Sequence, residues 1–261
     1  MLRFKQTILA LLILLIANAG VAQNKLTICT DTNFWYPFTY IKHQEAMGLH
    51  IDIISTALRN LGFEPNFVSY SWKECLNQAK EGLIDAVATA SYQEERALYL
   101  NYPEGASVDV KSPWRVTQVG YVVVTSALNK KGEKNSYQFE GDFKSIPQPV
   151  RVPIHYSVIG DLQKEGLTVK QGKSSMDNFK KLIQERTGSV VDVEEAAKLF
   201  ETQPAFAEKL VIQKRPLNNK SYYLAFSKKS ALTSEEERMI WKEIAKVRSN
   251  STVMAEFLKK Y

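Results

Sequence analysis

The chain has 261 residues, of which 44% are hydrophobic and 24% are charged, enough for one large globular domain or two smaller ones. Its formal net charge of +6 is mild and the charges are mixed along the chain, which disfavours a nucleic-acid-binding or membrane-surface protein. With three histidines, two cysteines, no CxxC spacing and no phosphate-binding loop motif, the sequence predicts neither a metal site nor a cofactor.

Residues 1–22 have the pattern of a cleaved secretory signal peptide. Arg3 and Lys5 form a basic start, residues 8–16 form an apolar core, and small residues follow. A membrane anchor is the alternative, but this core is too short to cross ~30 Å of hydrocarbon. The mature protein is therefore expected to be soluble and exported. Cys29 follows Leu-Thr-Ile rather than a small residue, so no lipid anchor is predicted.

Short apolar strands and amphipathic helices alternate in the next part of the chain. Strands are predicted at 26–30, 66–70 and 85–90, and helices at 48–63 and 72–82. Strand–helix–strand–helix–strand order implies a parallel sheet with right-handed crossovers. Cys29 and Cys75 fall within this unit; in an exported chain they either form a disulfide or remain buried thiols, and the sequence leaves both open.

A second α/β unit follows. Its predicted strands and helices occupy, in order, 119–125, 150–155, 158–166, 167–172, 174–188, 189–192, 193–202, 209–215 and 221–227, before tail helices at 233–248 and 252–259. If the strongly β runs at 119–125 and 221–227 are crossings, the second unit is an insertion in the first. We then expect lobe 1 to comprise 23–118 and 224–261, and lobe 2 to comprise 119–223. Ligands of such folds bind beyond the carboxyl ends of strands and at domain interfaces.

Small polar groups and an arginine follow the predicted strand at 85–90. Ser91 and Glu94 have capping-box spacing, which predicts a helix that begins directly after Ser91. Unpaired N–H groups at a helix start favour an anion, and the Arg96 guanidinium can hold a carboxylate by two parallel bonds. Thr89 and Ser91 add hydroxyl donors. The alternative is that Arg96 pairs with a neighbouring surface acid.

Aromatic and acidic side chains lie near the same predicted edge. Trp35, on the loop after the first strand, is predicted to wall a pocket rather than only to pack that loop. Trp72 opens a helix there and is either a core residue or a contact. Asp31 ends the first strand and either accepts hydrogen bonds from a ligand or forms an Asx turn.

Four segments resemble the bacterial extracellular solute-binding proteins for polar amino acids, the periplasmic receptors of ABC importers. They are TDTNFWYPFTY, GLHIDIISTALRNLGF, SYSWKECLNQAKEGLIDAV and ATASYQEERALYLNYP, in the family's order. The second unit departs from the family: its loop has Pro153, His155, Tyr156 and Ser157 where a Gly-Ser/Thr turn is usual. His50 also replaces the usual first Asp of the early helix.

The resemblance implies a two-lobed α/β fold of the type II periplasmic-binding-protein kind, with two parallel-sheet lobes joined by two crossing strands. It implies a monomeric periplasmic receptor, not an enzyme, that delivers a small carboxylated solute, an amino acid in the first instance, to an ABC permease. It assigns the ligand carboxylate to Arg96 and stacking to Trp35. The alternatives are a periplasmic lyase or dehydratase, with Glu94 and Glu95 as candidate acids, and a ligand-sensing module that acts through a partner protein.

The resemblance also places Asp192, at the end of the strand 189–192, across the cleft from Arg96, where it would pair with a ligand ammonium. Asp192 and Glu195 have capping-box-like spacing, so an N-cap without a ligand role is the alternative. Tyr156 and Ser157 are further candidate contacts from the loop of the second unit.

The export signal is testable on the secreted protein. N-terminal sequencing is expected to begin at Gly20 or Gln23, because the small residues at Ala19 and Ala22 suit the signal peptidase. Mature protein that retains Met1 would contradict the cleaved-signal prediction.

Overall fold

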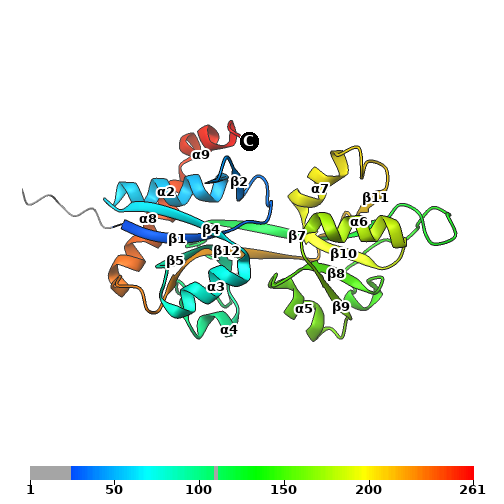
Figure 1. Ribbon diagram of the computed structural model, residues 1–261, viewed down its shortest axis with the longest axis horizontal. Coiled ribbons are helices and arrows are strands. Elements are labelled where there is room, and N and C mark those ends of the chain that lie inside the picture. The colour runs from blue at the N-terminus through cyan, green and yellow to red at the C-terminus, as the bar shows by residue number, and fades with distance from the viewer. Residues whose placement is uncertain (1–24, 109–110) are drawn as a thin grey trace, which may run out of the picture.

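The computed structural model describes residues 25–108 and 111–261 and shows two α/β lobes joined by two long strands (Figure 1). The predicted signal peptide, residues 1–22, lies outside the described residues. The two-lobed α/β fold with two connecting strands is as predicted, while the residue boundaries given above for the lobes stay a prediction.

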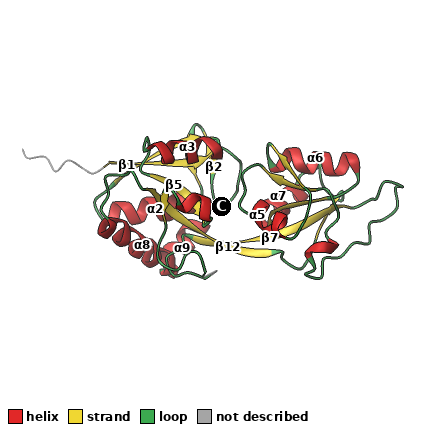
Figure 2. Ribbon diagram, turned by 90° about the horizontal axis from the view of Figure 1, so that it is seen from below, coloured by secondary structure: helices red, strands yellow, loops and turns green. Residues whose placement is uncertain are grey.

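Lobe 1 contains both ends of the described chain. Its strands are β1 (Lys25–Asp31), β2 (Tyr40–Lys42), β3 (Glu45–Met47), β4 (Glu64–Tyr70), β5 (Ala86–Ser91) and β6 (Leu100–Asn101). Its helices are α2 (Leu49–Asn60), α3 (Trp72–Glu81), α4 (Glu94–Ala97), α8 (Ser234–Ser249) and α9 (Ser251–Leu258). Strands β4, β1 and β5 pair in parallel in that order, and helices cover both faces, with α3 on one and α2, α8 and α9 on the other (Figure 2).

Lobe 2 repeats this plan with shorter elements. Its strands are β8 (Val150–Pro153), β9 (Val169–Gly172), β10 (Ser189–Val193) and β11 (Leu210–Ile212). Its helices are η1 (Phe143–Ser145), α5 (Val158–Lys164), α6 (Ser175–Glu185) and α7 (Glu194–Thr202). Strands β10, β8 and β9 pair in parallel, so the inner strands of both lobes have the predicted orientation.

The two connecting strands, β7 (Thr117–Ser126) and β12 (Asn218–Ser227), make the two lobes one mixed sheet. They pair antiparallel with each other. β12 then continues into lobe 1 by pairing antiparallel with β5, and β7 continues into lobe 2 by pairing antiparallel with β10. The parallel sheets expected from the sequence are therefore each extended by an antiparallel strand.

Side chains of β7 alternate between the two hydrophobic cores of lobe 2, which lie on opposite faces of its sheet. Tyr121 and Val123 pack with α5, whereas Val122 and Val124 pack with α6 and α7, because successive side chains of a strand point to opposite faces. This explains why a continuous apolar run marks the strand: both of its faces are covered.

The helical spacing predicted around Ile54 identifies the core face of α2. Ile54, Ala57 and Leu58 have no exposed surface and pack with Ile240 and Ile244 of α8. Gly62 ends the segment with a φ of 81°, a conformation that glycine adopts without steric cost. The first strand of lobe 1 and its helix are thus held together before the chain reaches the site.

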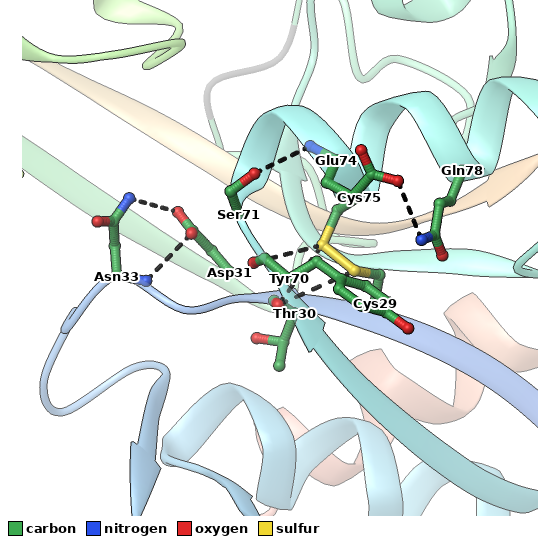
Figure 3. Close-up of a disulfide and its surroundings, with 9 residues drawn as sticks. All are labelled: Cys29, Thr30, Asp31, Asn33, Tyr70, Ser71, Glu74, Cys75 and Gln78. Atoms are coloured by element: carbon green, nitrogen blue, oxygen red, sulfur yellow. Dashed lines mark hydrogen bonds between the residues drawn. A yellow bond between two sulfur atoms is a disulfide. The ribbon is translucent and has the colours of Figure 1, made fainter. Parts of the chain in front are cut away.

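A disulfide between Cys29 and Cys75, left open by the sequence, ties β1 to α3 (Figure 3). Cys29 lies two residues before Asp31, and Cys75 lies one helical turn after Trp72. Ser71 caps α3, since its Oγ accepts from the Glu74 N–H at 3.3 Å. The covalent bond therefore fixes the end of β1 against the start of α3.

Loss of this disulfide is expected to lower the free energy of unfolding by about 2–4 kcal/mol, because it closes a loop in the unfolded chain. The comparison is the urea unfolding midpoint of wild type and of the double variant Cys29→Ala/Cys75→Ala. A reductant should lower the midpoint of the wild type and leave that of the double variant unchanged. Equal midpoints for the oxidised wild type and the double variant would contradict the expectation.

Candidate ligand-binding site

A cavity lies where the two lobes and the two connecting strands meet, and it encloses about 420 Å³ when its open mouth is included. Lobe 1 contributes the ends of β1 and β5, the loop after β1, and the starts of α3 and α4. Lobe 2 contributes the loop between β8 and α5, and β7 and β12 contribute one tyrosine each. The lining residues are Asp31, Trp35, Thr39, Trp72, Ala88, Thr89, Ser91, Arg96, Tyr121, His155, Tyr156, Ser157 and Tyr222.

Arg96 is the buried cation of this cavity, with 5% of its surface exposed. Its Nη1 donates to the carbonyl oxygen of Ser91 at 3.1 Å and to Ser91 Oγ at 3.3 Å, and its Nη2 donates to the carbonyl oxygen of His155 at 3.0 Å. The guanidinium carbon lies 5.3 Å from the centre of the Trp72 ring. Arg96 therefore bridges the two lobes and is oriented by an aromatic face.

No carboxylate within the described chain forms an ion pair with Arg96. The expected alternative, pairing with a neighbouring surface acid, is thus not what these residues show. A buried charge is costly unless it is paired and hydrogen-bonded, and the partners present are neutral oxygens. The site can accordingly gain from an anion that reaches the cavity.

The helix predicted near Tyr92 is present but begins at Glu94, and the predicted capping box of Ser91 with Glu94 is not formed. Ser91 is the last residue of β5, and α4 has only four residues, with Gln93 as an N-cap that makes no side-chain cap bond. Pairing of Ser91 with Tyr222 keeps it in the strand, so the antiparallel ladder outcompetes the local cap. The groups that this edge offers to an anion are therefore the Arg96 guanidinium and hydroxyl groups, and not a helix terminus.

A bulge in β5 directs Thr89 at the cavity. The register with β12 shifts between Tyr223 and Ala225, and Thr89 has a φ of 63°. A β-branched residue rarely adopts this left-handed conformation, and bulges of this kind redirect side chains beside functional sites. His155, on the opposite lobe, also has a positive φ, of 65°, and lines the same cavity.

Aromatic side chains form much of the wall. Trp35 packs edge-on against Tyr222 with ring centres 4.9 Å apart, and the hydroxyls of Tyr121 and Tyr222 are 2.7 Å apart. Trp72 and Tyr156 complete this set. Sequence reasoning found the two tryptophans and Tyr156 but missed both strand tyrosines, because a strand that is apolar on both faces does not reveal which residue meets a cavity.

His50 lies behind this wall. Its ring centre is 5.2 Å from that of Trp35 and 4.8 Å from that of Phe38. Burial lowers the pKa of His50 to about 3, so the ring is neutral at physiological pH and supports Trp35 as part of the apolar packing. His50 is not among the residues that line the cavity.

Asp31 both makes its own turn and lines the cavity. Its Oδ1 accepts from the Asn33 N–H at 3.1 Å, and its Oδ2 accepts from Asn33 Nδ2 at 2.9 Å. Burial raises the pKa of Asp31, while the bonds from Asn33 and the backbone of Trp72 oppose the rise. Figure 3 shows this turn beside the disulfide, so the Asx-turn alternative describes the local structure.

Asp192 is not itself a lining residue of the cavity, and its contact with a ligand stays a prediction. It lies within β10 with no exposed surface. Its Oδ1 accepts from the Val193 N–H at 2.8 Å, while Oδ2 accepts no hydrogen bond from the described residues. The N-cap alternative is not observed, because α7 begins after Val193 without a side-chain cap. Burial raises the pKa of Asp192 to about 6. Burial also raises the pKa values of the cavity tyrosines Tyr121, Tyr156 and Tyr222, and the charge of Asp192 contributes to the rise.

The loop between β8 and α5 closes the site from lobe 2. Gln93 Nε2, in lobe 1, donates to the carbonyl oxygen of Ser157 at 3.0 Å, which adds a second bond between the lobes. The Ser157 hydroxyl is buried and lines the cavity, and no hydrogen bond to it is formed within 25–108 and 111–261. Of the nine candidate residues from the sequence, all but Asp192 therefore line one cavity; ligand contact by each stays a prediction.

A wider groove continues from the mouth of this cavity. It encloses about 1980 Å³ including open solvent, and it shares Ser91, Arg96, His155 and Tyr156 with the cavity. Glu94 and Glu95 line the groove and not the cavity. Within the described residues, no cluster of three or more His, Cys, Asp or Glu side chains could hold a metal ion.

Two comparisons of the sequence give different outcomes. The sequence model of the bacterial extracellular solute-binding proteins, family 3, matches residues 26–256. No curated protein matches the chain.

Solved structures share the fold at low sequence identity. Holo ArgBP from T. maritima has a TM-score of 0.66 at 17% identity, covering 92% of this chain and 97% of that chain. The GluR0 ligand-binding core from Nostoc punctiforme in complex with (L)-glutamate has a TM-score of 0.67 at 15% identity, covering 90% and 98%. The ancestral amino acid-binding protein AncCDT-1, a precursor of cyclohexadienyl dehydratase, has a TM-score of 0.65 at 15% identity, covering 91% and 95%.

The buried Asp192 gives a pH-dependent prediction. Its pKa is raised from 3.8 to about 6 in the folded protein, so the stability that the protonated form contributes is complete below pH 4 and is lost as the pH rises through 6. Asp192→Asn keeps an acceptor for the Val193 N–H and cannot ionise. It should raise the free energy of unfolding at pH 7.5 by up to about 3 kcal/mol, with no such gain at pH 4.

Urea unfolding of both proteins at the two pH values measures this difference. Glu201→Gln, an exposed position on α7, serves as the control and should stay within about 0.5 kcal/mol at both. A gain for Asp192→Asn that is the same at pH 4 and pH 7.5 would show that ionisation of Asp192 is not its cause.

Proposed function

Because the chain belongs to the bacterial extracellular solute-binding proteins, family 3, we propose that it captures a small carboxylated solute in the cavity between its lobes. In the periplasm it would deliver this solute to the permease of an ABC importer, acting as a monomer. Amino acids are the first solutes to test, because structures with this fold include holo ArgBP and a core bound to (L)-glutamate.

One observation carries the proposal: a buried arginine points its guanidinium at the cavity without an acidic partner from the described chain. Hydrogen bonds from arginine to a carboxylate are charge-assisted and often paired, and they are about twice as strong as bonds to neutral oxygens. A carboxylate that displaces the carbonyl oxygen of His155 or Ser91 would therefore exchange a weak partner for a strong one. Thr89, Ser91 and Ser157 would supply further hydroxyl groups.

Hinged closure of the lobes follows from the way they are joined. β7 and β12 connect them, and the cross-lobe bonds Arg96–His155 and Gln93–Ser157 lie at the cavity. A ligand favours the closed form only through contacts that the open form lacks. A carboxylate held by Arg96 and covered by Tyr156 would provide such contacts, and the closed form would give a permease a surface to recognise.

Export and solubility are parts of the same proposal. The signal-like residues 1–22 support export. Among the described residues, no helix is both long enough and apolar enough to cross a membrane. A lyase has less support, since the paired acids that would serve it, Glu94 and Glu95, line the outer groove. A sensory role would need a partner protein that the sequence does not identify.

Arg96→Ala should weaken carboxylate binding by about ten- to a hundredfold, since it removes a charge-assisted pair of roughly 1.5–3 kcal/mol. Arg96→Lys should recover only part, because an ammonium cannot form the planar fork. Thermal-shift screening of wild type against L-amino acids and simple carboxylates identifies a ligand, and calorimetry then gives its affinity for each variant.

Arg238→Ala is the matched control, an exposed arginine of α8 that pairs with Glu235. It should bind as tightly as wild type. Native mass spectrometry of freshly purified wild type and Arg96→Ala adds an independent readout of any co-purified solute. Unchanged affinity in Arg96→Ala would remove the carboxylate assignment.

A further inference from the structure

The lining of the cavity is unusually rich in aromatic rings for its size. Trp35, Trp72, Tyr121, Tyr156 and Tyr222 come from five separate segments and converge on one space. These rings decide what kind of solute body fits beside Arg96.

Two of these rings use their polar ends on each other, whereas the buried Nε1 of Trp35 has no hydrogen-bond partner among the described residues. The hydroxyls of Tyr121 and Tyr222 bond to each other at 2.7 Å, and the Trp72 face is covered by the Arg96 guanidinium. Trp35 meets Tyr222 edge-on. The surface left for a ligand body is therefore mainly ring faces and edges with the methyl group of Ala88.

Asp31 is the acidic residue of the lining, and it already has hydrogen-bond partners of its own. Both carboxylate oxygens of Asp31 already accept from Asn33, and Asp192 is fully buried outside the lining. Burial, and then the charges of Lys73 and Arg96, lower the pKa of His155 at the mouth. The positive charges of Arg96 and Lys73 favour an anion, while Asp31 keeps further lone pairs that can accommodate a ligand ammonium.

From these contacts we infer that the preferred occupant is a carboxylate whose body is a single flat ring. The carboxylate binds Arg96, and the ring packs against Trp35 and the tyrosines of the connecting strands. Flat rings suit this wall because aromatic pairs in edge-to-face or offset geometry gain ~0.5–1.5 kcal/mol beyond the area they bury. An α-ammonium is tolerated but is not the second recognition element. This inference rests on the proposed capture of a carboxylate and narrows its class.

Calorimetry on the wild-type protein tests this with four probes: phenylacetate, cyclohexylacetate, L-phenylalanine and L-alanine. Phenylacetate and cyclohexylacetate share a carboxylate and a six-membered ring and differ in flatness. Phenylacetate should bind at least about tenfold more tightly than cyclohexylacetate. L-phenylalanine should bind within about tenfold of phenylacetate, and L-alanine more weakly than either.

The outcomes separate this inference from the proposed function. Equal affinity for phenylacetate and cyclohexylacetate overturns the flat-ring inference. Tighter binding of L-alanine than of phenylacetate also overturns the flat-ring inference. If the binding of L-alanine is then lost in Arg96→Ala, the proposed function as a carboxylate receptor still holds. If all four probes bind equally well to wild type and Arg96→Ala, both the inference and the proposed function fail. If none binds, the flat-ring inference fails, and the proposed function fails with it only when the thermal-shift screen also finds no carboxylate that binds.

Two variants on the loop after β1 test whether the ring of the ligand packs against Trp35. Trp35→Leu should weaken phenylacetate about tenfold and cyclohexylacetate less, because a leucine keeps apolar bulk but removes the aromatic face. Phe34→Leu is the matched control: Phe34 is 49% exposed and does not line the cavity, so its change should stay within twofold. Equal losses in the two variants would overturn the placement of the ring against Trp35.

Discussion

The organisation of this protein depends on one buried cation, the Arg96 guanidinium, whose described partners are neutral oxygens. A charge in that position requires fixed acceptors, and they come from both lobes: Ser91 at the end of β5 and His155 on the loop after β8. Trp72 covers its face, and the Cys29–Cys75 disulfide holds the helix that carries Trp72. The end of β5, the start of α3 and the disulfide that holds α3 thus all help to position the Arg96 side chain.

The floor of the cavity belongs to neither lobe alone. Tyr121 and Tyr222 lie on the two connecting strands and bond to each other, whereas Trp35 and Tyr156 come from loops of opposite lobes. In the proposed closure, residues on loops of opposite lobes would change their separation more than residues on two hydrogen-bonded strands would. A ligand would therefore rest on a nearly constant base while its sides are closed by the lobes.

Hydrophobic period and turn residues predicted two α/β units in series, since Ile54, Ala57 and Leu58 mark one helix face and the valines around Val123 mark a covered strand. The two-lobed type II fold was implied by the family resemblance. The same sequence patterns placed Arg96 and Trp35 at one edge of the predicted sheet. Three features of the site depend on tertiary pairing and could not be predicted from the sequence. The ladder with β12 keeps Ser91 in its strand, Asp192 is fully buried, and the orientation of Tyr121 and Tyr222 follows from the register between β7 and β12.

The register of β7 with β12 also has a consequence for modularity. Tyr121 and Asn218 are opposite each other in the ladder, so the chain leaves lobe 1 and returns to it at neighbouring positions, about 5 Å apart as antiparallel partners are. In the topology of the chain, lobe 2 is thus a single insertion between two adjacent strand positions of lobe 1. An exchange of this insert would therefore need two junctions at adjacent strand positions, and the new lobe would have to supply an acceptor for Arg96 in place of the His155 carbonyl oxygen.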